Sequence, residues 1–319
     1  MGGKKKQRSE LFDNVEFGIF LLTVWVFRSL SLKNAYRLSK AIFVLLYYID
    51  FKHRTRVIQH LLHSGMAATR EEAVSLAKKN CDHMAKVLVE ITKIDQCING
   101  ENYKEKLSVK VSDPKAREIL TGKPRQVIVI TAHLGNWELA GSAYCWQGDV
   151  NMTSIMRPLN NPKIGDYVYR HRTNSRHQTV SREKGLRPLL KALNAGDTLA
   201  IVADQHARTG EGVETLFFGH PVRTHATPAL LHLKTGIPLW PCFLIRQDDE
   251  FHFAFESDGL IEYTPTGDKD ADILKITQMV NDAIEKFIRR HPDQWIWAHR
   301  RWLDINRKNH KTPHQETAA

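Results

Sequence analysis

The sequence predicts an α/β protein with a mixed, largely parallel central sheet flanked by helices. Short apolar runs rich in β-branched residues alternate with helix-compatible segments, the order expected where helices connect parallel strands. One of these runs, residues 127–130, is β-branched throughout, which is typical of a strand buried on both faces. With 319 residues and 42% hydrophobic content, the chain is long enough for one large α/β domain and an added segment.

The predicted elements begin with a long helix. Residues 71–94 carry apolar side chains at alternating four- and three-residue steps, which predicts a helix with a core-facing stripe. A short helix opens at Asp113 and Pro114 and ends at Gly122. Further strands are expected at residues 150–155, 199–203, 239–244 and 251–256, and further helices at residues 136–146, 161–173, 185–195, 227–235 and 272–290.

A histidine follows the first buried strand. His133 lies where residues 127–130 give way to a loop, and open α/β sheets bind ligands beyond the carboxyl ends of their strands. His133 is therefore a candidate catalytic residue. Asp204 directly follows the apolar run 199–203 and is expected at the same edge, where it would hold an arginine or a substrate hydroxyl. A capping role is the alternative for Asp204.

Glu138 is the second candidate catalytic residue. Two residues five positions apart in a regular helix diverge by about 140°, so His133 and Glu138 can meet only if the chain bends, as Gly135 allows. A carboxylate on one imidazole nitrogen would fix the tautomer and leave the other nitrogen to accept a proton. The pair would then act as a general base. Because the sequence has no G-x-S-x-G elbow, the attacking group should belong to a substrate. The alternative is an ordinary loop histidine beside a solvated glutamate.

The charge of the chain indicates an acidic partner. Its formal net charge is +11 and its pI is about 9.4, which suits nucleic acid, anionic lipid or an acidic protein. The sequence contains none of the usual nucleic-acid-binding signatures, so nucleic acid is disfavoured. The four cysteines are widely spaced and form no C-x-x-C, which argues against a zinc site or a disulfide framework and fits a reducing cytosolic setting.

The N-terminal region carries two short apolar runs. Residues 17–27 and 41–49 are each about ten residues long, below the roughly 18 to 20 needed to cross a bilayer as a helix. Basic residues flank both runs, which favours helices lying in a membrane interface, with a pair of buried core helices as the alternative. We therefore divide the chain into a membrane-associating helical segment (1–60), an α/β domain (61–307) and a polar tail (308–319).

Several sequence blocks together resemble one known family. The blocks are His133-Leu-Gly-Asn-Trp-Glu138, Arg157-Pro-Leu-Asn-Asn-Pro162 with Arg170 and Arg172, Ala203-Asp-Gln205, Phe217-Phe-Gly-His-Pro221 with Thr224, Thr235-Gly-Ile-Pro238 with Pro241, and His291-Pro-Asp-Gln-Trp-Ile-Trp-Ala-His-Arg-Arg-Trp302. In this order they resemble the bacterial late lipid A acyltransferases, the lauroyl and myristoyl transferases, over roughly residues 10 to 305. The segment Arg172-Thr-Asn-Ser-Arg176 and the helix after Thr224 depart from the family pattern, which leaves the acceptor and the acyl length open.

The resemblance implies an activity and its residues. His133 and Glu138 would catalyse transfer of a fatty acyl group from acyl carrier protein, or from acyl-CoA, to a hydroxyl of a phosphorylated glucosamine lipid. Arg157 and Arg170 would bind the anionic acceptor or steady the catalytic carboxylate, with surface salt bridges as the alternative. No metal or redox cofactor would be needed, because a thioester is already activated. The implied location is the cytoplasmic face of the bacterial inner membrane.

Three other functions are compatible with some of these residues. An acyltransferase for a different lysophospholipid or glycolipid would use the same residues. An esterase would replace the lipid hydroxyl with water, but the missing nucleophile elbow weakens it. A non-catalytic membrane-surface protein would have no need of both His133 and Glu138.

Overall fold

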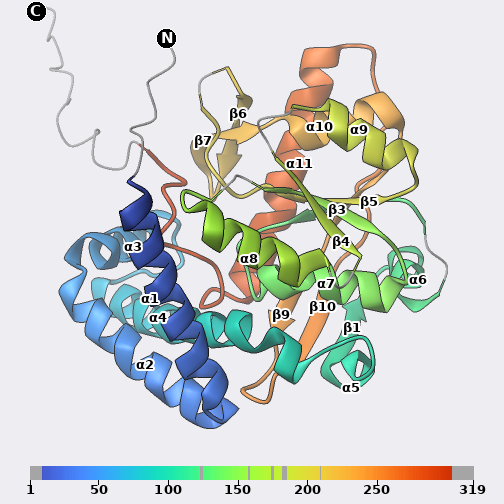
Figure 1. The fold of residues 1–319 in the computed structure, drawn as a ribbon. Coiled ribbons are helices and arrows are strands. Elements are labelled where there is room, and N and C mark those ends of the chain that lie inside the picture. Colours follow the sequence, from blue (N-terminus) through green and yellow to red (C-terminus); the bar gives the residue numbers. More distant parts are fainter. Residues whose placement is uncertain are drawn as a thin grey trace, which may run out of the picture.

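A parallel sheet forms the centre of the protein (Figure 1). The computed structural model describes residues 9–122, 125–156, 159–173, 176–181, 185–208 and 210–303. Within those ranges, five strands pair in the order β4-β3-β5-β2-β8, and every pairing in this sheet is parallel. The strands are β2 (Ile128–Thr131), β3 (Met152–Met156), β4 (His177–Ser181), β5 (Thr198–Val202) and β8 (Leu239–Pro241). The predicted fold class is confirmed.

A second, mixed sheet lies beside the first. Its order is β1-β10-β9, with β1 (Leu107–Val111) parallel to β10 (Phe253–Ser257) and β10 antiparallel to β9 (Phe243–Arg246). The prediction of a single strand at 239–244 was therefore wrong, because this segment contains β8 and β9, which belong to different sheets. The chain passes from one sheet to the other through Cys242, in an apolar run that has no polar residue or glycine to mark the change.

Helices cover both faces of the parallel sheet. Side chains of β2 alternate between two cores: Ile128 and Ile130 pack in one with α9–α11, and Val129 packs in the other with α6 and α7. The helices after the first strand are α6 (Pro114–Thr121), α7 (Trp137–Gly148), α8 (Pro162–Thr173), α9 (Arg187–Asn194), α10 (Thr227–Thr235) and α11 (Lys269–Arg290). A hairpin of β6 (Gly212–Phe217) and β7 (His220–His225), which the sequence did not predict, packs on α11.

The N-terminal helices form a layer at one side of the domain (Figure 1). They are α1 (Glu10–Ser29), α2 (Leu32–Ile49), α3 (Phe51–His63) and α4 (Arg70–Cys97), and the short α5 (Tyr103–Lys106) follows. α2 lies along α4, and Ala35 and Tyr36 of α2 are buried against it. Among the helices described, none is both long enough and apolar enough to cross a membrane. The predicted tail, 308–319, lies outside the described residues.

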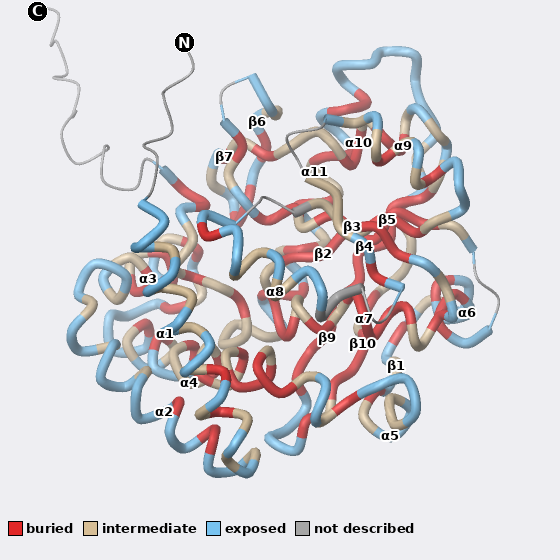
Figure 2. The backbone as a smooth tube through the Cα atoms, viewed as in Figure 1, coloured by how far each residue is buried: buried red, intermediate tan, exposed pale blue. Residues whose placement is uncertain are grey.

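The outer side of this layer is apolar and exposed. Figure 2 shows much of α1 and α2 in the colour of exposed residues, whereas the central strands are buried. Leu11, Val15, Ile19, Leu22 and Trp25 of α1 are each at least half exposed, from 55% to 74%. Their spacing of four, four, three and three residues places them on one face of the helix. α2 adds exposed Ile42, Val44, Leu45, Leu46, Tyr48 and Ile49.

Candidate active site

His133 and Asp204 meet at the carboxyl edge of the parallel sheet. His133 lies two residues beyond β2 and Asp204 two residues beyond β5, and these strands pair in parallel with Thr131 opposite Val202. One carboxylate oxygen of Asp204 lies 2.8 Å from Nδ1 of His133. The other accepts the backbone N–H of His133 at 2.9 Å and the indole N–H of Trp295 at 2.8 Å. Asp204 is fully buried, so three donors enclose its charge.

The carboxylate on Nδ1 is therefore Asp204. That Glu138 acts as a catalytic partner of His133 stays a prediction. Among the described residues, the oxygens of Asp204 contact His133 and Trp295 and not an arginine. A contact of Asp204 with a substrate hydroxyl stays a prediction. The sequence does not show which strands are neighbours, and only the pairing of β2 with β5 brings Asp204 to the imidazole. Glu138 lies in the first turn of α7 and lines the same cavity as His133.

The surrounding charges favour a basic imidazole. Burial by itself lowers the pKa of His133, but the charge of Asp204, its hydrogen bond and the charge of Glu138 together raise that pKa above the usual 6.5. Burial alone would raise the pKa of Asp204; the adjacent His133 and the hydrogen bonds from His133 and Trp295 lower it well below its usual range. With Nδ1 held by Asp204, Nε2 is the nitrogen that can exchange a proton with a substrate.

A second histidine lies beside the first. The rings of His133 and His299 are 4.6 Å apart between centroids and nearly perpendicular. Burial and the neighbouring His133 lower the pKa of His299 to about 4, so His299 is neutral at physiological pH. Its Nδ1 is buried and has no hydrogen-bond partner among the described residues. Trp295 and His299 were not among the predicted site residues, although the closing tryptophan-rich block contains both.

Three of these side chains also have the chemistry of a metal site. Ligand atoms of His133, Asp204 and His299 lie within 4.8 Å of one another, and two imidazoles with a carboxylate are a known zinc donor set. However, Nδ1 of His133 and both oxygens of Asp204 already take part in hydrogen bonds. This arrangement favours proton transfer at His133 over metal binding.

The loop between His133 and α7 is held tightly. Gly135 has φ +64°, and a Cβ atom there would lie 2.0 Å from the carbonyl oxygen of Leu244, so a larger residue would force the backbone apart. The Gly135 N–H donates to the carbonyl of Gln294, and the N–H of Ile296 donates to the carbonyl of His133, both at 3.1 Å. The C-terminal segment thus runs along the loop and brings Trp295 and His299 to the site.

An apolar cavity opens at the histidine. Its volume is about 540 Å³, within the range of small-molecule sites. His133 and Glu138 line it together with Trp137 and Tyr144 of α7 and Ala200 of β5. The cavity therefore extends along α7 for about two turns, roughly 10 Å at 1.5 Å per residue, and its wall is mainly apolar.

The structure tests the two predicted arginines only in part. Arg157 lies outside the described residues. Arg170 is exposed on α8, the helix whose Val168 lines the cavity, and Arg170 itself does not line it. Its role at an acceptor site stays a prediction.

Fold and site together define a class of protein in which a histidine–carboxylate pair, at the edge of a parallel sheet, faces an apolar cavity of about 540 Å³. Over residues 4–304 the sequence matches the family described as bacterial lipid A biosynthesis acyltransferase, and the chain belongs to that family. The resemblance drawn from the sequence blocks is confirmed.

The curated relatives are distant. The phosphatidylinositol mannoside acyltransferase of Mycolicibacterium smegmatis is 25% identical over 185 residues, which cover 56% of this chain and 57% of that protein. The lipid A biosynthesis palmitoleoyltransferase of Escherichia coli K12 is 27% identical over 181 residues, 56% of each chain. The chain thus spans little more than half the length of these relatives. A crystal structure of the 1-acyl-sn-glycerophosphate acyltransferase PlsC from Thermotoga maritima covers 83% of this chain and 99% of its own, with a TM-score of 0.35 and 13% identity.

Proposed function

We propose that the protein transfers a fatty acyl group from a thioester donor to a hydroxyl of a lipid A precursor. The observation that carries the proposal is the His133–Asp204 pair facing an apolar cavity. Nε2 of His133 takes the proton of the lipid hydroxyl while its oxygen attacks the thioester carbonyl. The tetrahedral intermediate then expels the thiolate, which takes the proton back from the imidazolium. An ester bond forms, the thioester bond breaks and the histidine is regenerated.

The cavity supports the assignment of the acyl group. A saturated chain offers only dispersion and hydrophobic contacts, and about 0.8 kcal/mol is gained per buried methylene. The apolar wall along α7 and the sheet suits such a chain, with its carbonyl at the His133 end. Glu138 lies at that end too, where its carboxylate would orient the acceptor hydroxyl or stabilise the imidazolium.

The net charge and the relatives support the proposed donor and acceptor. A chain with a net charge of +11 suits acyl carrier protein, which is acidic, and a phosphorylated lipid. The Escherichia coli relative is named for lipid A biosynthesis. The Mycolicibacterium relative is named for phosphatidylinositol mannoside, which makes another lysophospholipid or glycolipid acceptor the second candidate.

An acceptor panel tests this function. The purified protein is given acyl carrier protein or CoA thioesters with a lipid A precursor, a lysophospholipid or a phosphatidylinositol mannoside, and products are read by mass spectrometry. We expect one acceptor to gain one acyl group, as the thioester is consumed and the free thiol of the carrier is released. Release of free fatty acid without transfer to any acceptor would instead indicate an esterase.

We further propose that α1 and α2 dock on the cytoplasmic face of the bacterial inner membrane. Their exposed apolar face matches a membrane interface, and fully burying one large apolar side chain gives about 1.5–3 kcal/mol. We expect the double change Leu22→Glu and Trp25→Glu to weaken binding to anionic vesicles at least tenfold in sedimentation assays. Leu274→Glu, at an exposed leucine of α11, is the matched control and should bind as wild type. Equal binding by the Leu22/Trp25 variant and wild type would refute the docking face.

A further inference from the structure

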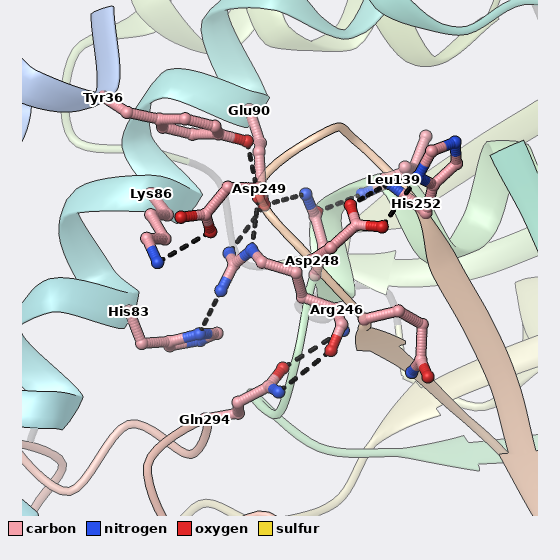
Figure 3. Close-up of polar contacts among 12 residues, drawn as sticks. Tyr36, His83, Lys86, Glu90, Leu139, Arg246, Asp248, Asp249, His252 and Gln294 are labelled. Atoms are coloured by element: carbon pink, nitrogen blue, oxygen red, sulfur yellow. Dashed lines mark hydrogen bonds and ion pairs between the residues drawn. The ribbon is translucent and has the colours of Figure 1, made fainter. Parts of the chain in front are cut away.

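A buried polar network is hydrogen-bonded to the loop after His133. Figure 3 shows its members Tyr36, Glu90 and Arg246. At its centre is Glu90 of α4, which is fully buried. Arg246 of β9 donates to both of its carboxylate oxygens, through Nε and, at 2.8 Å, through Nη2. The hydroxyl of Tyr36 donates to one oxygen at 3.2 Å, and the side-chain amide of Asn136 donates to the other at 2.8 Å. The carboxylate therefore joins α2, α4, β9 and the loop after His133.

Arg246 also ties the network to the loop by a second route. Its backbone N–H donates to the side chain of Gln294 and its carbonyl accepts from the same side chain, each at 3.1 Å. The carbonyl of Gln294 in turn accepts the N–H of Gly135. Figure 3 shows Gln294 facing the backbone of Arg246 and His83 at the end of its guanidinium, where Nη1 lies 2.6 Å from Nδ1 of His83.

Asn136 is the residue through which this network reaches the site. Its side-chain oxygen accepts the N–H of Leu139 at 2.9 Å and so caps the N-terminus of α7. Its side-chain nitrogen donates to Glu90, so the amide is held at both ends. Asn136 is three residues after His133 and two before Glu138, which lies in the first turn of the helix that Asn136 caps.

Stability alone is a weak reason for such an arrangement. The free-energy cost of desolvating two charges can exceed the gain from their attraction. Replacing a buried ion pair by apolar residues is therefore often neutral or stabilising. A fully satisfied polar network does, however, enforce one geometry on the groups it joins. Here the joined groups include Gly135 and Asn136, two successive residues of the turn between His133 and Glu138.

We propose that Glu90 and Asn136 are positioning residues, which set the start of α7 and thereby hold Glu138 at a fixed place relative to His133. The inference rests on the proposed function for its kinetic consequence, although the placement itself is independent of it. Neither residue contacts the cavity. A displacement of about 1 Å at a reacting group can cost on the order of 10²-fold in rate.

Two variants disturb the hydrogen bond between Asn136 and Glu90 but keep the negative charge at residue 90 and the N-cap of α7. Asn136→Ser keeps an N-cap oxygen but loses the donor to Glu90, and Glu90→Asp keeps the charge but draws the carboxylate back by one methylene. Tyr36→Phe is the matched control, since it removes a hydrogen bond from α2 to the other oxygen of the same carboxylate and leaves the bond from Asn136 in place. We expect the two test variants to lower kcat ten- to a hundredfold with a smaller change in KM, and Tyr36→Phe to keep the wild-type kcat at a similar change in melting temperature.

A titration of His133 by NMR, with ring-labelled histidine, separates positioning from general destabilisation. The charge of Glu138 contributes to the raised pKa of His133, so a Glu138 that moves away from His133 lowers that pKa, as Glu138→Gln does directly. We expect Asn136→Ser and Glu90→Asp to shift the titration in the same direction as Glu138→Gln, with Tyr36→Phe unchanged. An unchanged titration in both test variants, or an equal shift in Tyr36→Phe, overturns the proposal. If the wild-type protein transfers no acyl group, the proposed function fails, yet the titration still decides this inference.

Discussion

Replacing His133 with alanine is expected to lower acyl transfer by about 10² to 10⁴, the usual contribution of general acid–base catalysis. The imidazole is the group in the site whose raised pKa and fixed tautomer let it take a proton from a hydroxyl. Its side chain is 18% exposed toward the cavity, so its loss should leave the fold intact. Initial rates with acyl carrier protein thioester, beside melting temperatures, measure both quantities.

Glu138→Ala is expected to produce a loss of similar size, and the double variant should be little worse than His133→Ala alone. Residues that act as one unit give non-additive effects. Independent losses that multiply in the double variant would mean that Glu138 acts on the substrate separately from His133. Near wild-type rates in His133→Ala would refute the mechanism.

The fold was readable from the sequence because strand and helix patterns here agree with burial. The continuous apolar run of β2 predicts a strand packed on both faces, and its side chains do divide between two cores. The strands that were missed, such as β4 (His177–Ser181) and the β6–β7 hairpin, carry polar residues that hide their pattern. Which strands neighbour one another depends on packing across the whole chain, and local composition does not encode it.

For the site as for the fold, the sequence predicted where single residues lie but not which of them are neighbours. Placing His133 and Asp204 at the sheet edge needed only the ends of two apolar runs. Pairing them needed the order β5-β2, in which the two strands lie side by side. Trp295 and His299 reach the site from far along the chain, through backbone contacts with the His133 loop that no local pattern predicts.

Replacing Asp204 with asparagine is expected to reduce transfer about as much as replacing His133 with alanine, because it would hold the imidazole of His133 in the wrong tautomer. One oxygen of Asp204 accepts two N–H donors, from the backbone of His133 and from Trp295. The single oxygen of an asparagine would keep that place, so its NH₂ group would face Nδ1. Nδ1 would then have to accept, the proton would reside on Nε2, and Nε2 could no longer act as a base.

The residual activity of Asp204→Asn should also have a shifted pH profile. Transfer needs neutral His133, so activity falls as the pH drops through its pKa, which Asp204 raises above 6.5. Without the carboxylate that pKa falls, and the acidic limb of kcat/KM should move to lower pH. Asp272→Asn is the control: Asp272 is a buried carboxylate bound to Tyr263 and Thr266, away from the site. The melting temperature of Asp272→Asn should fall, while the acidic limb of its kcat/KM profile should match that of the wild type. If Asp204→Asn retained both wild-type kcat and the wild-type limb, Asp204 would have only a structural role, and orientation of His133 would have to come from another group.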